Sequence, residues 1–171
     1  MRLFLVVLLT CLCVACTEKN PQVPANKNSH NSRQETDLLQ YNKACLQAET
    51  NEISQFIQHH PTYAACDEGW WIQVIKKGDG PAIQPMQPIT MLYSVERLDG
   101  SICYSSDTDG EKKIIVGKRQ WLQGIDLLLP TLTIGSEVNV IFPSRMAYGF
   151  RGKDNCIGSY CPILCRIVIQ Q

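Results

Sequence analysis

The sequence predicts an α+β fold, in which an amphipathic helix precedes an antiparallel sheet of five to six short strands with one short helix inserted. Apolar residues recur at helical spacing up to Ile57, and after Gly69 their period falls to two. Asp99-Gly100 separates two strand-like runs, which is the pattern of a tight hairpin. We therefore expect the inserted helix to cover one face of the sheet.

Residues 1–15 have the features of a lipoprotein signal peptide. Arg2 is followed by an apolar run over residues 3–9, which is far shorter than the roughly 20 apolar residues that cross a bilayer. Residues 12–16 read LCVAC and resemble a lipobox, in which cleavage before the last cysteine leaves that cysteine lipidated. We expect a lipid on Cys16, and the alternative is a soluble secreted protein that is cut nearby.

Residues 16–36 are rich in Asn, Gln, Ser, Pro and Lys and contain almost no apolar side chains. A segment of this composition does not bury enough apolar surface to offset the entropy lost on ordering. We therefore expect a flexible linker that lets the following domain reach away from a membrane.

An amphipathic helix is predicted over residues 37–60, where apolar residues recur at helical spacing. It is expected to end near His60, because Pro61 disfavours helical backbone at the residue before it. Its apolar stripe packs on the following domain or pairs with a second copy of the chain, and the sequence leaves both open. The C-terminal position of His59 and His60 favours a helix-dipole role over metal binding. The stripe comprises Leu38, Leu39, Cys45, Leu46, Ile53, Phe56 and Ile57.

The rest of the chain, residues 68–171, is predicted to form one sheet domain. Residues 120–129 form the expected short helix, which Pro130 ends. Apolar residues alternate with polar ones along most of the expected strands. Those strands cover residues 71–75, 89–95, 101–104, 114–116, 138–142 and 163–169.

Charge and motif content exclude several functions. Removal of Arg2 with the signal leaves one basic side chain fewer than the 16 acidic ones, without a basic cluster, so nucleic acid is not an expected partner. No GxSxG or HExxH motif is present, and all three histidines precede the sheet domain. Acid–base and nucleophilic catalysis therefore have no evident residues there.

Six cysteines follow Cys16, and in an exported protein disulfides are their natural state. The preferred pairs are Cys156 with Cys161 and Cys45 with Cys66, among fifteen connectivities that six cysteines allow. A zinc site is disfavoured, because C-x4-C-x3-C differs from the usual paired spacing and its last cysteine lies in a strand. We expect no metal and no other cofactor.

Four blocks of sequence resemble consecutive parts of the FKBP family, the macrolide-binding peptidyl-prolyl cis-trans isomerases. Gly124, Gly135 and the triplet Ala147-Tyr148-Gly149 carry most of this resemblance, which spans residues 69–169. It is closest to lipid-anchored members in Bacteroidetes, including those associated with gliding motility, which share a leading helix and a CYSS stretch. The blocks are GWWIQVIKKGDGP, TMLYSVERLDGSICYSS, VGKRQWLQGIDLLLPTLTIGSEVNVIFPSRMAYG and CPILCRIVI.

The resemblance implies a bent sheet wrapped around the short helix, with an aromatic-lined pocket for a proline ring between them. Tyr148 would offer its hydroxyl to the substrate as the catalytic residue, and the backbone N–H of Leu122 would bind another carbonyl. Tyr93 and Trp121 have a second interpretation as ordinary core residues of a sheet domain. The implied substrate-binding set is Tyr93, Tyr104, Ser105, Trp121, Leu122, Ile125, Tyr148, Ile157 and Cys165.

The chain departs from the family pattern at four positions. Ile125 stands where a tryptophan commonly forms the pocket floor, and Ser105 stands where an aspartate lies on the wall. Lys112 and Cys165 replace phenylalanines. The floor stays apolar but smaller, which argues against tight macrolide binding and for slow catalysis.

Rotation about an X-Pro bond moves no proton and breaks no bond, so a pocket without histidine suffices for it. The resemblance therefore implies a prolyl isomerase, and the export signal implies that it assists the folding of exported, proline-containing polypeptides. Thr17 is not a retention signal of the aspartate type, which favours the outer membrane, with the domain in the periplasm or at the cell surface. The alternative is a non-catalytic binding module or chaperone, and a dimer through the leading helix stays open.

Overall fold

The computed structural model describes residues 29–170, with side chains from residue 34 onward. The predicted signal peptide 1–15, the predicted lipidation site Cys16 and the linker up to residue 28 lie outside the described residues. The described residues fall into two units, which divide after Leu38. The second unit contains the sheet domain and most of helix α2 (Ser29–His59).

Helix α2 begins at Ser29 rather than at residue 37, so the predicted linker is helical over its last residues. Low apolar content predicts few core contacts, but it does not stop a helix from extending into polar sequence that lacks glycine and proline. The helix ends at His59, one residue before the end expected from Pro61. In the described part of the chain, no helix is long and apolar enough to cross a membrane.

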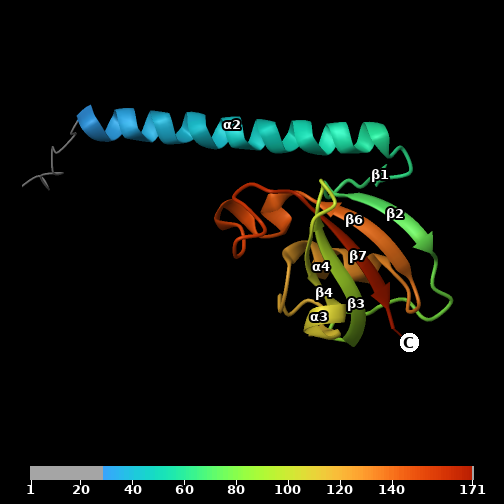
Figure 1. Cartoon of the computed structure of the whole chain (residues 1–171). Coiled ribbons are helices and arrows are strands. Elements are labelled where there is room, and N and C mark those ends of the chain that lie inside the picture. The colour runs from blue at the N-terminus through green and yellow to red at the C-terminus, as the bar shows by residue number, and fades with distance from the viewer. Residues whose placement is uncertain (1–28, 171) are drawn as a thin grey trace, which may run out of the picture. The chain divides into compact units, whose positions relative to one another are not determined.

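The seven strands of the described residues form one antiparallel sheet, in which the order is β1-β2-β6-β7-β3-β4 (Figure 1). Strand β5 pairs with the part of β3 that β4 leaves free. The predicted strands are present. The structure adds strand β1, whose two residues are too few to show a periodic pattern in the sequence. The strands are β1 (Ala64–Ala65), β2 (Trp71–Lys76), β3 (Pro88–Arg97), β4 (Ile102–Ser105), β5 (Lys112–Ile115), β6 (Glu137–Phe142) and β7 (Ile163–Ile169).

Helix α4 (Gln123–Leu128) packs on the inner face of the sheet, as predicted, and continues into a 3-10 turn over Leu129–Thr131. The predicted hairpin is also present, with the Arg97 N–H donating to the Ser101 carbonyl at 2.9 Å and Gly100 at a φ of 88°. The α+β prediction is therefore confirmed. A one-turn helix α3 (Ser106–Asp109) and two 3-10 turns, Ser144–Met146 and Gly149–Arg151, were not predicted.

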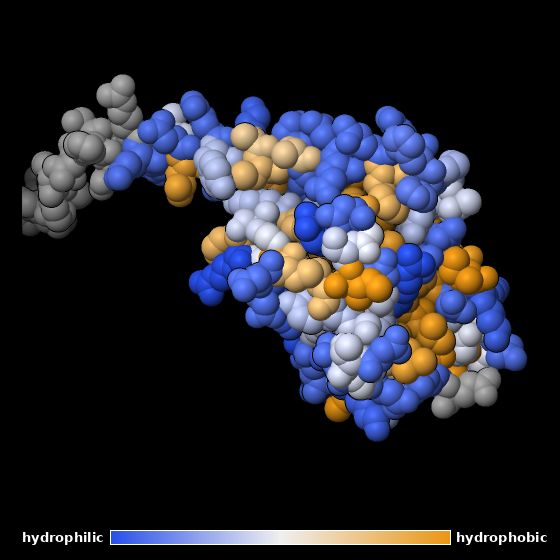
Figure 2. Space-filling model, in the orientation of Figure 1, coloured by the Kyte–Doolittle hydropathy of each residue, from blue (hydrophilic) through white to orange (hydrophobic). Residues whose placement is uncertain are grey.

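Helix α2 packs on the outer face of the sheet through the C-terminal half of its apolar stripe. Ile53 is buried against Ile141 and Leu164 of the two central strands. Both faces of β6 are covered as a result, and for this reason its residues are buried almost without alternation. Farther along the outer face Leu92 is exposed, and hydrophobic residues gather on this side of the sheet in Figure 2.

The predicted disulfides Cys156–Cys161 and Cys45–Cys66 are wrong. The structure joins Cys103 of β4 to Cys156, with a Cα–Cα distance of 5.7 Å, and leaves Cys45, Cys66 and Cys161 as free thiols. The pair is separated by 53 residues, and the sheet topology brings the loop after β6 beside β4. Proximity in sequence was therefore a poor guide to this connectivity.

Gly124 is expected to tolerate no side chain, because a Cβ atom there would lie 2.4 Å from Cδ1 of the buried Phe142 ring. Gly124→Ala should lower the free energy of unfolding by about 1–3 kcal/mol, the usual cost of overpacking a core. Chemical denaturation measures the change. Gly158→Ala is the control, since its Cβ would meet nothing within 4 Å. Equal stability of the two variants would contradict this account of the α4 packing.

Candidate functional site

Four aromatic side chains nominated from the sequence line one cavity of about 200 Å³. They come from separate parts of the chain: β3, β4, the segment before α4, and the loop after β6. Charged residues complete the lining, so the cavity is more polar than predicted. The aromatic residues are Tyr93, Tyr104, Trp121 and Tyr148, and the others are Asp109, Gly110, Glu111, Lys112 and Lys153.

The four rings form two contacting pairs. Tyr93 and Trp121 meet edge to face, with centroids 4.9 Å apart and an interplanar angle of 65°. Tyr104 and Tyr148 are tilted by 44° with centroids 6.2 Å apart. Aromatic pairs in such arrangements gain stability beyond the area they bury. The two pairs therefore give the cavity a fixed aromatic lining.

Tyr148 presents a phenol that keeps its proton. It follows the 3-10 turn Ser144–Met146 and precedes Gly149, whose φ of 66° a glycine adopts without strain. Burial raises the pKa of Tyr148 well above its usual value, although the neighbouring Trp121 indole opposes the shift. The hydroxyl is therefore a hydrogen-bond donor at any physiological pH.

Asp109 contributes a carboxylate to the cavity lining, whereas Ser105, the position implied by the resemblance, contributes no lining. The Tyr93 hydroxyl donates to Oδ2 of Asp109 at 3.2 Å, while the Ser106 hydroxyl bonds to the backbone N–H and carbonyl of Tyr93. Burial raises the pKa of Tyr93, and the Asp109 carboxylate adds to the shift. Ser105 does not line the cavity. Sequence reasoning missed Asp109 because it lies four residues later, at the end of the unpredicted helix α3.

Tyr104 is held by the loop after β6. Its hydroxyl donates to Oδ2 of Asp154 at 2.6 Å, and it lies 3.4 Å from the Lys153 carbonyl. Desolvation and this hydrogen bond raise the pKa of Tyr104 to about 12. The adjacent disulfide Cys103–Cys156 ties the same strand to the same loop. One wall of the cavity is thus fixed by a covalent bond and a hydrogen bond.

The remaining nominated residues lie behind the cavity in the hydrophobic core and do not line it. Ile125 and Cys165 are fully buried, and burial raises the pKa of the Cys165 thiol. Ile157 is buried because its backbone pairs with Lys153 and turns the loop inward. Leu122 precedes α4 with a buried side chain, and its backbone N–H makes none of the turn and loop hydrogen bonds of the described residues.

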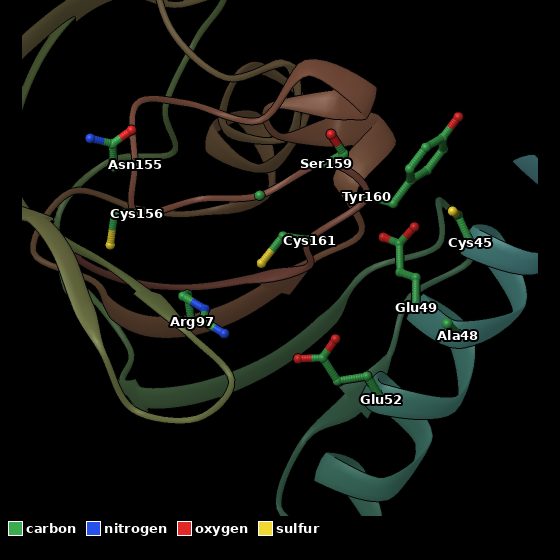
Figure 3. A pocket seen from close by; sticks show the side chains of 11 residues that line it. Cys45, Ala48, Glu49, Glu52, Arg97, Asn155, Cys156, Ser159, Tyr160 and Cys161 are labelled. Carbon is green, nitrogen blue, oxygen red and sulfur yellow. The ribbon is translucent and has the colours of Figure 1, made fainter.

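A larger cavity of about 490 Å³ lies between the second-unit part of α2 and the loop around residues 155–161 (Figure 3). The free thiols of Cys45 and Cys161 line it. Burial raises the pKa of Cys161, which keeps that thiol protonated and weakly nucleophilic. Among the described residues no group of His, Cys, Asp and Glu side chains is arranged to hold a metal ion. The aromatic cavity is therefore the candidate functional site.

The rate of any reaction that depends on the phenols should not change with pH near neutrality. The pKa of Tyr104 is raised to about 12, and the pKa of Tyr148 is also raised. Both hydroxyls therefore stay protonated at every pH below about 10, the ordinary pKa of tyrosine. We expect kcat/KM to vary less than about twofold between pH 6 and pH 9. A pH–rate profile measures this. A bell-shaped profile with an inflection inside that range would show that another group participates.

Comparison with known proteins agrees with this geometry. Residues 80–160 match the model of the FKBP-type peptidyl-prolyl cis-trans isomerase family. A peptidyl-prolyl cis-trans isomerase of Pseudomonas syringae pv. tomato superposes with a TM-score of 0.65 at 20% identity, over 75% of this chain and 93% of that one. AtFKBP13 superposes with a TM-score of 0.60 at 21% identity, over 64% of this chain and 97% of that one. Residues 80–160 are therefore similar to an FKBP-type peptidyl-prolyl cis-trans isomerase domain, and the fold of the chain agrees with that similarity.

Proposed function

We propose that this chain is a prolyl isomerase that assists the folding of exported polypeptides while a lipid on Cys16 holds it to a membrane. The observation that carries the catalytic part is the convergence of two aromatic pairs on one cavity. The family match of residues 80–160 supports the same reaction. The residues before the described part of the chain motivate the export and the anchor.

The cavity suits the physics of proline isomerisation. Resonance keeps the X-Pro bond planar and separates charge between oxygen and nitrogen, and the twisted state loses this separation. Aromatic walls exclude water from the proline ring and so favour the less polar twisted state. The protonated Tyr148 hydroxyl donates to a flanking carbonyl. No proton transfer is required, which agrees with a cavity that contains no histidine.

The lipobox-like segment at Cys16 motivates the proposal that the substrates are exported polypeptides, because the isomerase itself would be exported. Uncatalysed X-Pro exchange takes tens to hundreds of seconds, which is slow enough to limit folding after export. Thr17 favours delivery to the outer membrane, with the domain in the periplasm or at the cell surface. The resemblance to lipid-anchored family members in Bacteroidetes, including those associated with gliding motility, motivates this placement. Mass spectrometry of the mature N-terminus tests the lipid, and an unmodified N-terminus downstream of Cys16 would refute the anchor.

The isomerase test is a proline-exchange assay on the full chain. Trp121→Ala removes one wall of the cavity and should lower kcat/KM by about tenfold or more. Tyr148→Phe removes only the hydroxyl, and the loss of one hydrogen bond should lower kcat/KM by about three- to tenfold. Tyr41→Ala, at an exposed position of α2, is the control. A folded chain that gives no rate above background would refute the proposal.

A non-catalytic binding module is the second candidate. The charged residues that line the cavity favour it, because they depart from a dry, aromatic pocket. Such a module would suppress aggregation of a proline-free client as well as that of a proline-rich one. Tyr148→Phe would leave this property unchanged, whereas it should slow an isomerase.

A further inference from the structure

Two lysine side chains lie over the rings of the aromatic cavity. Nζ of Lys112 is 5.2 Å from the centroid of Trp121. Nζ of Lys153 is 4.5 Å from the centroid of Tyr104 and 5.6 Å from that of Tyr148. These are cation–π distances, and such contacts are weak where water reaches the cation. Each aromatic pair of the cavity is thus covered by one ammonium group.

Neither ammonium group is paired with a carboxylate. In residues 34–170 the ion pairs within 4.0 Å join Arg97 to Asp99 and Arg166 to Glu96, away from the cavity. Among the described residues, the side chains of Lys112 and Lys153 contact only the aromatic rings, so their charges are available to an anionic ligand.

The carboxylates around the cavity, in contrast, already accept hydrogen bonds. Asp109 accepts from the Tyr93 hydroxyl at 3.2 Å, and Asp154 accepts from the Tyr104 hydroxyl at 2.6 Å. Glu111 accepts from the side-chain amide of Gln170 at 2.9 Å. These donors are neutral, so each carboxylate keeps its negative charge, but its side chain is held in place by the protein. The charged groups of the cavity that have no protein partner other than an aromatic ring are therefore the two ammonium groups.

An ammonium group over an aromatic ring occupies the face on which a proline ring would pack. A carboxylate next to the proline would attract the ammonium away from the ring and pair with it, whereas a neutral neighbour would leave the ring covered. From this geometry we propose that the cavity selects X-Pro segments in which an aspartate or glutamate adjoins the proline. This inference deepens the proposed isomerase function and rests on it.

The two lysines act on different ends of the bound segment. Lys112 lies over the Tyr93–Trp121 pair and Lys153 over the Tyr104–Tyr148 pair, so one ammonium is available on each side of a proline held between the pairs. An acid before the proline and an acid after it should therefore both be favoured. A segment with both should bind more tightly than a segment with one.

The test compares short peptides with the full chain. The central sequences are Ala-Pro-Ala, Glu-Pro-Ala, Ala-Pro-Glu, Glu-Pro-Glu and Lys-Pro-Ala, and NMR titration gives each dissociation constant. One acid should tighten binding about 1.5- to fivefold relative to alanine at low salt, the range of an exposed ion pair. Lysine should weaken it. The preference should shrink in 0.5 M salt, because salt screens exposed charges.

The variants Lys112→Gln and Lys153→Gln should each reduce the preference for acid, and the double variant should abolish it. Lys113→Gln is the matched control, because it removes the same charge from the next residue of β5, whose side chain is exposed on the opposite side of the strand. Wild-type protein that binds Ala-Pro-Ala as tightly as the acidic peptides would overturn the inference. So would an unchanged preference in the double variant.

Exchange rates measured by NMR on the same samples separate this inference from the proposed function. Equal catalysis of all five peptides, with equal binding, would support the isomerase and overturn the selectivity. Selective binding of the acidic peptides without faster cis-trans exchange would support the selectivity and overturn the isomerase.

Discussion

Reduction of the Cys103–Cys156 disulfide is expected to destabilise the domain by about 4 kcal/mol, which is the loop-closure value for a bridge that spans 53 residues. The bond limits the unfolded chain, so its loss raises the entropy of the unfolded state. It also joins β4 to the loop that contacts Tyr104, and kcat/KM should therefore fall with stability. Denaturant unfolding with and without reductant measures the first effect, and an exchange assay measures the second.

The double variant Cys103→Ala/Cys156→Ala is the matched control for this experiment. Its stability should resemble that of the reduced wild type and should not respond to reductant. Cys45→Ser, at a free thiol of α2, should leave the response to reductant intact. A wild-type midpoint that does not move on reduction, with a thiol count that proves the bond is open, would contradict the prediction.

The fold was predictable because its signals are local. The period of two after Gly69 and the Asp99-Gly100 turn act within a few residues, and each corresponds to an observed element. The short helix is also present, but it ends at Leu128, and Pro130 lies inside the 3-10 turn that follows. The start of α2 was not predictable from composition, since a polar segment without helix breakers extends a helix that forms downstream. The elements that were missed are two to four residues long, below the length at which periodicity is visible.

The candidate site was predictable only in part. The family resemblance indicated Tyr93, Tyr104, Trp121 and Tyr148, which the structure brings to one cavity. It did not indicate the role of Asp109, which depends on a four-residue helix. Lys153 over Tyr104 likewise depends on how the loop after β6 is folded, and that loop is shaped by long-range contacts.

Helix α2 contacts the site indirectly, through Glu49. This side chain is 5% exposed, and its carboxylate accepts hydrogen bonds from the backbone N–H of Ser144 and, at 2.8 Å, from the Ser144 hydroxyl. Ser144 starts the 3-10 turn that leads into Tyr148. The predicted apolar stripe of α2 explains why the helix packs on the sheet. The buried Glu49 carboxylate determines which loop the helix contacts.

Glu49→Ala should therefore lower the free energy of unfolding by about 2–4 kcal/mol, because it leaves two buried donors of Ser144 without an acceptor. Glu49→Gln keeps one acceptor oxygen and should cost less. Gln58→Ala, at an exposed position of the same helix, controls for altered helix propensity. Chemical denaturation gives the stabilities, and amide hydrogen exchange should show faster opening of residues 144–148 in Glu49→Ala. Exchange that increases only within α2 would mean that Glu49 stabilises the helix and does not position the loop that carries Tyr148.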